Sequence, residues 1–181
     1  QIGCSVHISR ILVKELDKPR AVEVSKSLMT TDPSQILDDP QVQLVVEVMG
    51  GEMPALDYLR RALQQGKSVV TANKEVMAKH GPELLELAQK NGVQILFEAS
   101  VGGGIPILGP LTKDLRGNEI QTIRAIINGT TNYILTKMTY DGMEFNQALK
   151  EAQELGYAEA DPTNDVEGID AGYKLAILAS L

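Results

Sequence analysis

The sequence predicts an α/β fold in which short apolar strands alternate with amphipathic helices over the first hundred residues. Runs typical of strands and apolar residues at helical spacing follow one another in turn. After the three consecutive glycines 102–104 the pattern changes, and several helices are expected around a single strand. Alternation of strand and helix is typical of βαβ units on a parallel sheet. We therefore expect two domains, residues 1–100 and residues 101–181, the second of the α+β class.

Composition excludes several classes of protein. The 181 residues carry 17 Lys and Arg against 24 Asp and Glu, a formal net charge of -7, which argues against a nucleic-acid surface. The single cysteine argues against a disulfide framework and against a zinc site built on cysteine. No segment approaches the roughly 20 apolar residues that span a bilayer. We expect a cytoplasmic protein with neither a nucleic acid nor a membrane as its partner.

The elements of the first domain follow from local patterns. Strands are expected over residues 6–13, 44–48, 68–71 and 93–98. The second of these is short and apolar, so we expect it to be buried on both faces, as strands of parallel sheets are. Helices are expected after Asp32, which would act as N-cap, over residues 54–65, which Gly66 ends, and over residues 82–90.

The second domain is expected to be mostly helical. Alternating apolar residues predict one long strand over residues 120–128. Thr130 is expected to cap the helix after it, and Asn164 or Asp165 to cap the last helix. Helices are expected over residues 107–115, 131–138 and 144–155, and from residue 168 onward.

Both ends of the sequence suggest a piece of a longer protein. The chain begins at Gln1 without a methionine, and residues 176–181 form an apolar run with no stop signal for a helix. The alternative is a natural terminus whose last helix is docked on the protein.

Two loops follow expected strands at the edge where α/β sheets bind ligands. In residues 47–52, Gly50 and Gly51 would let a backbone approach a flat ligand closely; a tight turn is the alternative. In residues 71–75, Lys74 directly follows a buried strand and would face a cleft, unless it is a surface lysine in a turn.

Glycines 102–104 must serve a purpose, because consecutive glycines cost backbone entropy. A backbone-lined ion site and a hinge between the domains both remain open. They are not the dinucleotide-binding pattern G-x-G-x-x-G, which is absent from the chain.

The richest segment for chemistry is residues 156–174, where five acids lie within twelve residues. Asp170 and Lys174 are four apart and share one face of a helix, and a partly desolvated lysine beside carboxylates can donate a proton. The alternative is an exposed ion pair of little energetic value. Residues 128–133 sit between a strand and a helix, where free backbone amides attract anions or are simply capped.

Five segments together resemble the homoserine dehydrogenase family, and they occur in that family's order. They are residues 46–51, 71–75, 97–106, 128–135 and 156–174. The resemblance implies reduction of aspartate 4-semialdehyde to homoserine with NADPH or NADH, on the route to threonine, methionine and isoleucine. It also implies an incomplete Rossmann-like nucleotide-binding domain, followed by part of a catalytic domain that forms a homodimer.

The resemblance further implies roles for individual residues. Lys174 would donate the proton to the aldehyde oxygen, and Lys74 would be the second lysine near nicotinamide and substrate. Substrate contacts are implied for Glu159 and Asp170, which would hold the ammonium group, and for Asp165, Thr130 and Tyr157. Cofactor contacts are implied for Met49, Gly156 and Lys74. A monovalent cation, Na⁺ or K⁺, would be bound mainly by backbone carbonyls of Glu98, Val101, Gly103 and Ile105.

The sequence departs from the family in two respects that bear on activity. The chain stops seven residues after Lys174, where the family continues the catalytic domain. The Gly-rich loop after the first strand is missing, so we expect the isolated chain to bind NADP(H) poorly and to turn over little or not at all. The alternative is an inactive fragment that retains only the fold and dimer contacts; an unrelated α/β binding module would need all five motifs to coincide by chance. Lys14 favours NADP(H) over NAD(H), although Glu15 beside it weakens that preference.

Overall fold

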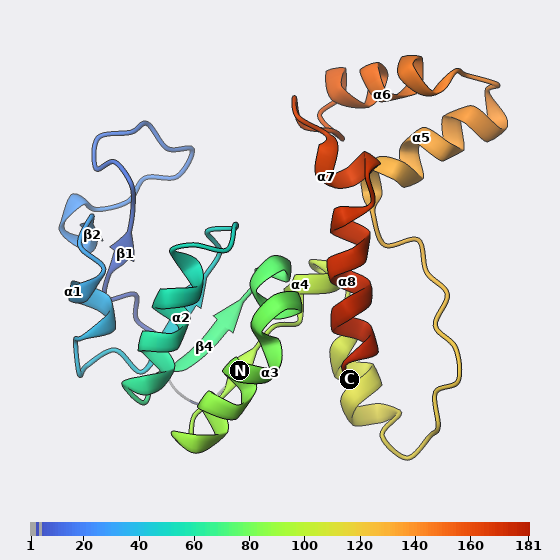
Figure 1. The fold of residues 1–181 in the computed structure, drawn as a ribbon. Coiled ribbons are helices and arrows are strands. Elements are labelled where there is room, and N and C mark those ends of the chain that lie inside the picture. The colour runs from blue at the N-terminus through green and yellow to red at the C-terminus, as the bar shows by residue number, and fades with distance from the viewer. Residues whose placement is uncertain (1–2, 4) are drawn as a thin grey trace. The chain divides into compact units, whose positions relative to one another are not determined.

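In a computed structural model, which describes residue 3 and residues 5–181, the chain forms two compact units. Unit 1 consists of Gln1–Thr71 and Pro82–Leu96, and unit 2 of Ala72–Gly81 and Phe97–Leu181. Figure 1 labels the elements of both. None of the described helices is long and apolar enough to cross a membrane.

Unit 1 is built on parallel strands, which confirms the predicted α/β class. β3 (Leu44–Glu47), β4 (Ser68–Thr71) and β5 (Ile95–Leu96) pair in that order, and all three run parallel. The helices α2 (Ala55–Gln64) and α3 (Lys74–Lys90) connect them along the chain (Figure 1). A second parallel pair joins β1 (Ile11–Leu12) to β2 (Met29–Thr30). The 3₁₀ turn η1 (Lys26–Leu28) and the short helix α1 (Ser34–Leu37) flank β2.

Local signals determined these elements well. The apolar face of α2 is buried, and Gly66, with a φ of 72°, follows its end as predicted. The residue directly before α1 is Pro33 rather than the predicted Asp32, although Asp32 Oδ1 accepts a hydrogen bond from the backbone N–H of Ser34 at 2.9 Å. The buried residues of α2 are Ala55, Leu56, Leu59, Ala62 and Leu63.

Four predictions for unit 1 are wrong in detail. One is the strand expected over residues 93–98, which is shortened to β5. β3 is buried on one face only, because α2 contacts the sheet and Leu44 and Val46, pointing the other way, are 48% and 61% exposed. The first strand is shortened to β1, which pairs with the two residues of β2. The helix expected over residues 82–90 begins at Lys74, where Asn73 Oδ1 accepts from Val76 N at 3.1 Å.

Unit 2 is helical throughout its described elements. α5 and α6 pack through Ile134, Ala148 and Ala152, whose small alanine side chains let the two helices approach closely. The regular elements are α4 (Ala99–Gly102), the π-helical turn η2 (Pro110–Asp114), α5 (Gly129–Tyr140), α6 (Phe145–Glu154), α7 (Thr163–Val166) and α8 (Ile169–Ala179). The helix predicted over residues 107–115 is thus mostly replaced by η2.

The strand predicted over residues 120–128 does not form. The segment has no regular secondary structure and appears in Figure 1 as a thread leading to α5. Ile120, Ile123 and Ile126 are 45%, 42% and 77% exposed. A strand needs a hydrogen-bonded neighbour, and the described part of unit 2 contains no other strand.

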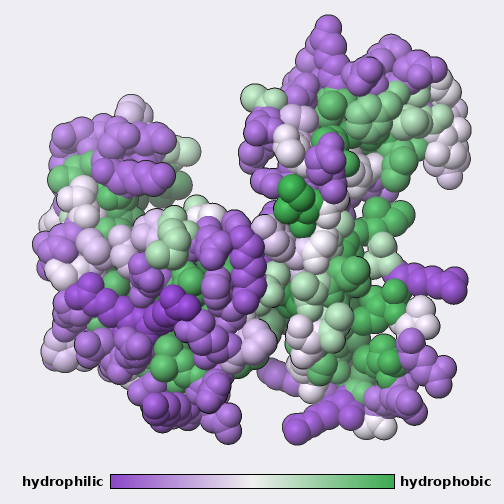
Figure 2. Space-filling model, viewed as in Figure 1, coloured by the Kyte–Doolittle hydropathy of each residue, from purple (hydrophilic) through white to green (hydrophobic). Residues whose placement is uncertain are grey.

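The visible surface of unit 2 varies in polarity. Figure 2 shows hydrophobic side chains gathered around α8, whereas the outer side of α6 is hydrophilic. On α8, Leu175 is 61% exposed and Ile169 is 38% exposed.

Candidate active site

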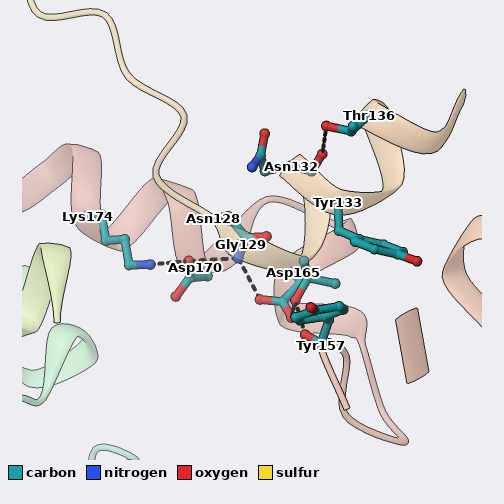
Figure 3. Close-up of a pocket in the computed structure, with 10 residues that line it drawn as sticks. Asn128, Gly129, Asn132, Tyr133, Thr136, Tyr157, Asp165, Asp170 and Lys174 are labelled. Atoms are coloured by element: carbon teal, nitrogen blue, oxygen red, sulfur yellow. Dashed lines mark hydrogen bonds and ion pairs between the residues drawn. The ribbon is translucent and has the colours of Figure 1, made fainter. Parts of the chain in front are cut away.

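A cavity of about 570 Å³ opens in unit 2 where the beginnings of α5 and α8 meet α7 (Figure 3). Its size falls within the roughly 300–1,000 Å³ of ordinary small-molecule sites. The lining residues are Asn128, Gly129, Thr130, Asn132, Tyr133, Thr136, Tyr157, Asp165, Asp170 and Lys174.

Helix α8 contributes an ion pair to this cavity. Asp170 and Lys174 lie one turn apart, and Lys174 Nζ is 2.8 Å from Asp170 Oδ2. Their side chains are only 3% and 15% exposed, so the pair is not the solvated surface pair that the sequence left open. Lys174 Nζ also donates to the carbonyl of Ile127 at 2.7 Å. An ammonium carries three hydrogens, so these two acceptors leave one for a ligand.

The second lysine, Lys74, reaches the same carboxylate. It is the first residue of α3 rather than part of a loop, and its Nζ forms an ion pair with Asp170 Oδ1. Its side chain is 43% exposed. Lys74 belongs to unit 2 by contact, although the sequence placed it in the first domain. One buried carboxylate therefore holds two ammonium groups, one on each oxygen.

The charge of Asp170 is stabilised against its burial. Burial by itself raises the pKa of this carboxyl, but hydrogen bonds from Asn128, Lys174 and Lys74 outweigh it and hold the pKa below its usual value. Asp170 is therefore an anion at neutral pH.

Asn128 is a central residue of the site that the sequence did not single out. Its Nδ2 donates to Asp165 Oδ1 at 2.7 Å and to Asp170 Oδ2 at 2.9 Å. Its Oδ1 accepts from Thr131 N at 2.8 Å, which makes Asn128 the N-cap of α5 in place of Thr130. Asparagine is among the preferred N-cap residues, so its position before Gly129 was the available signal.

The side chain of Thr130 lines the cavity and does not cap α5. Its Oγ1 lies 2.8 Å from the carbonyl oxygen of Tyr157 and 2.8 Å from Asp165 Oδ2. A hydroxyl has one hydrogen, so it serves only one of these acceptors at a time. Asp165 itself lies in α7 and does not cap α8, which is preceded instead by Gly168 with a φ of 74°.

Glu159, predicted to contact the substrate, and Gly156, predicted to contact the cofactor, do not line the cavity, and neither does Lys74. Glu159 is exposed, and its backbone carbonyl accepts from Gln153 Nε2 at 3.1 Å. Gly156, with a φ of 78°, follows α6 outside the lining.

Three lining residues of α5 were missed by the sequence. Figure 3 shows two of them, Asn132 and Thr136, at the edge of the cavity, where Thr136 Oγ1 donates to the carbonyl of Asn132 at 2.7 Å. The third, Tyr133, stacks on Tyr157 with ring centroids 4.9 Å apart and donates its hydroxyl to Glu151. Their signal was their spacing on one face of a helix that begins at a candidate anion site.

The loop after β3, in unit 1, is open. Gly50 and Gly51 have φ of 75° and 72°, and an added Cβ would meet nothing within 4 Å at either position. Met49 is 45% exposed, and its N–H is held by Glu47 Oε1 at 2.7 Å. This backbone fits the close approach of a flat group.

The loop that begins at Glu98 is fixed by its own carboxylate. Glu98 accepts the backbone N–H groups of Ile107, Leu108 and Gly109 at 2.5, 2.8 and 2.7 Å. The bond from Ile107 contributes most to lowering the pKa of this carboxyl. With three N–H groups bound to its carboxylate, Glu98 would offer a cation mainly its backbone carbonyl.

The other three residues expected at a cation site differ in exposure. Val101 is buried, Gly103 has a φ of 59°, and Ile105 is 72% exposed. Within the described residues, no group of three His, Cys, Asp or Glu could hold a metal ion. A site here would therefore depend on backbone carbonyls.

Comparison with protein families gives two matches that together span most of the chain. Residues 1–98 match the family model described as homoserine dehydrogenase, NAD binding domain, and residues 106–181 match that described as homoserine dehydrogenase.

Curated proteins and solved structures agree with this result. A homoserine dehydrogenase of Bacillus subtilis is 52% identical over 181 residues, which are all of this chain and 42% of that protein. One from Synechocystis is 51% identical over 98% of the chain and 41% of its own length. The crystal structure of a homoserine dehydrogenase from Thiobacillus denitrificans has a TM-score of 0.89 at 49% identity, covering 95% of this chain and 40% of that one.

A hyperthermophilic archaeal homoserine dehydrogenase in complex with NADPH has a TM-score of 0.77 at 38% identity, covering 83% of this chain and 47% of that one. The chain spans about two fifths of the length of the curated relatives it matches.

Proposed function

Because this chain belongs to the homoserine dehydrogenase family, we propose that it supplies the proton-donating site of an enzyme that reduces aspartate 4-semialdehyde to homoserine. The observation that carries the proposal is the convergence of Lys74 and Lys174 on the buried Asp170. Residues 1–100 are the proposed nucleotide-binding part, and residues 101–181 the proposed catalytic and dimerisation part.

The proposed chemistry needs one proton and one hydride. A nicotinamide dinucleotide, when bound, supplies the hydride to the aldehyde carbon. Negative charge then develops on the aldehyde oxygen, and the ammonium of Lys174 stabilises it and donates the proton that completes the alcohol. Lys74 adds a second positive charge near that oxygen. Asp170 holds both ammonium groups in place and remains an anion throughout.

The amino-acid part of the substrate would bind at the end of the cavity away from Lys174, near the start of α5. Thr130 offers one hydroxyl hydrogen to two oxygens, those of Tyr157 and Asp165, so an acceptor is left for the substrate's ammonium group. Gly129 and Thr130 begin α5, and the free amides of a helix N-terminus favour a carboxylate. Glu159 stays a prediction based on the resemblance alone.

We propose that unit 1 binds the nicotinamide dinucleotide. Its support is the lack of side-chain atoms and crowding at Gly50 and Gly51, where an added Cβ would meet nothing within 4 Å, beside the half-exposed Met49. The chain lacks the G-x-G-x-x-G loop, so these residues would form only part of such a site. Preference for NADP(H) is proposed from Lys14, an exposed residue two positions after β1. Gly156, in unit 2, stays a predicted cofactor contact.

Three further features of the parent enzyme are proposed from the family. A monovalent cation, Na⁺ or K⁺, would be bound by the carbonyls of Glu98, Val101, Gly103 and Ile105. The enzyme would be a homodimer, and it would work in the cytoplasm.

The decisive experiment restores a complete enzyme around this chain. Residues 1–181 replace the matching segment of the Bacillus subtilis homoserine dehydrogenase, and oxidation of NADPH by aspartate semialdehyde is followed. We expect an active chimera whose kcat falls by about 10²–10⁴ in Lys174→Met. Lys150→Met is the control, because Lys150 is 77% exposed on α6, outside the cavity. A Lys174→Met chimera with nearly unchanged kcat would refute the proposal.

The missing Gly-rich loop favours a second candidate, an inactive fragment. Assay of the isolated 181-residue chain distinguishes the two for this chain. We expect little or no turnover from it, and turnover near that of the chimera would exclude the fragment interpretation.

A further inference from the structure

We propose that Asn128 is a positioning residue of this site, whose side-chain amide fixes Asp165 and Asp170 and, through Asp170, both lysines. Its meaning for catalysis rests on the proposed function, whereas its effect on the carboxylates does not.

The orientation of the Asn128 amide is determined by its partners. The backbone N–H of Thr131 can only donate, so the atom 2.8 Å away must be the amide oxygen. The carboxylates of Asp165 and Asp170 accept, so the atom between them must be the nitrogen. A flipped amide would lose all three contacts together, and no second arrangement competes with this one.

The site also requires an asparagine in particular. Asn128 is 7% exposed, and both of its N–H donors are used by carboxylates while its oxygen caps α5. An aspartate here would keep the cap and lose both donors. A serine would keep an oxygen for the cap and lose the reach and the second donor.

The amide lies between two like charges. Oxygens of Asp165 and Asp170 both lie within hydrogen-bond distance of one nitrogen, so the carboxylates are close enough to destabilise each other's charge. The two N–H groups offset this repulsion by favouring both anions. In agreement, Asn128 is the foremost of the groups that lower the pKa of Asp170.

The residue before Asn128, Ile127, binds the positively charged partner of Asp170 through its backbone carbonyl. The carbonyl of Ile127 accepts from Lys174 Nζ at 2.7 Å, while the amide of Asn128 donates to Asp170, the partner of that lysine. Two consecutive residues therefore present an acceptor to the cation and a donor to the anion. Because Asn128 also caps α5, the same side chain fixes the backbone that carries the Ile127 carbonyl.

The test measures the titration of Asp170 in the 181-residue chain by NMR of its carboxyl carbon. The charged groups that face Asp170 are Lys74 on α3, Lys174 on α8 and, across the amide, Asp165 on α7. We expect Asn128→Ser to raise the pKa of Asp170 by about one unit or more, because a hydrogen bond to the anion is lost.

A matched control and a second variant keep the result decisive. Asn118→Ser makes the same change at an exposed residue whose side-chain amide donates to the carbonyl of Leu115 at 3.4 Å, and it should leave the titration unchanged. Asn128→Asp keeps the cap oxygen and serves if Asn128→Ser does not fold; it should raise the pKa further by adding a charge. If folded variants titrate like the native chain, or if both unfold, Asn128 is only a helix cap and the proposal is wrong.

A kinetic arm connects the residue to catalysis. In the Bacillus subtilis chimera we expect Asn128→Ser to lower kcat at least tenfold and to change KM less, because the proton donor is displaced more than the substrate. The acid limb of the pH–rate profile should move upward with the Asp170 titration. A change in KM with kcat unchanged would contradict a positioning role. An inactive native chimera would count against the proposed function, while the NMR titration would still decide the role of Asn128.

Discussion

Replacing Asp170 with asparagine tests whether its charge holds the two lysines. The substitution keeps the shape of a side chain that is 3% exposed and removes its negative charge. Breaking a buried ion pair from one side costs about 3–5 kcal/mol, because the remaining charge is left uncompensated. Here water recovers part of that cost at Lys74, which is 43% exposed, and Lys174 keeps the Ile127 carbonyl. We therefore expect unit 2 to lose about 2–3 kcal/mol of unfolding free energy at neutral pH.

The effect should depend on pH in a defined direction. The pKa of Asp170 in the folded chain lies below its ordinary value of 3.8. A carboxyl with a lowered pKa contributes its full stabilisation above the unfolded pKa, and loses it as the pH falls through the folded pKa. The difference between native chain and Asp170→Asn should be constant from about pH 5 to 7 and shrink below about pH 4.

Urea unfolding followed by tyrosine fluorescence suits this test. The chain has no tryptophan and five tyrosines, and all of these except Tyr58 lie in unit 2. Glu154→Gln is the control, because its 3.8 Å pair with Lys150 is exposed and such pairs contribute little. A difference below about 1 kcal/mol at neutral pH, or one that persists undiminished in acid, would refute the reasoning.

Three more substitutions have defined outcomes. Thr130→Val should cost about 1–2 kcal/mol in urea unfolding, because the oxygens of Tyr157 and Asp165 lose the hydrogen they share; an unchanged midpoint would contradict this. Ile134→Ala should cost about 3 kcal/mol in the same assay, since a side chain that is 1% exposed leaves a cavity beside alanines that cannot fill it; a cost under about 1 kcal/mol would show that the helices collapse onto it. Glu98→Gln should speed amide hydrogen exchange of residues 107–109 about tenfold by NMR, because an NH₂ group replaces one accepting oxygen; unchanged exchange would mean that other contacts hold the loop.

Elements whose burial depends on near neighbours were predicted well from the sequence. β4 forms over residues 68–71 as expected, and α2 ends before Gly66. In both cases the signal is local: an apolar run between turn residues, or leucines at helical spacing before a glycine. α3 was mistaken because Pro82 was taken as a helix start, while the actual cap is the side chain of Asn73.

The failed strand over residues 120–128 shows where local pattern stops being informative. Ile123, Ala125 and Ile127 alternate as the apolar residues of a strand would, but a strand is stabilised by a partner's backbone. Alternation indicates which residues share a face and contains no information on whether that partner exists. Within the described chain residues 120–126 are exposed and have no strand partner.

The residues of the site also differ in how well the sequence predicts their contacts. The pairing of Asp170 with Lys174 was predictable, because residues four apart on a helix are neighbours. The role of Asn128 was not, since its two carboxylate partners lie 37 and 42 residues further along the chain. Residue spacing predicts contacts within a helix, and contacts between helices need the fold.

The arrangement of charge explains why one carboxylate serves two lysines. A single lysine paired with Asp170 would be neutral overall, whereas Lys74 and Lys174 together leave that cluster with one net positive charge. In the proposed reaction, this surplus charge would stabilise the aldehyde oxygen, which becomes negative as it is reduced. On the other side of Asn128, Asp165 offers a negative charge that no lysine of this cluster neutralises. The cavity therefore has a positive end and a negative end, separated by the neutral amide of Asn128. It favours a ligand that develops a negative charge at one end and carries an ammonium group at the other.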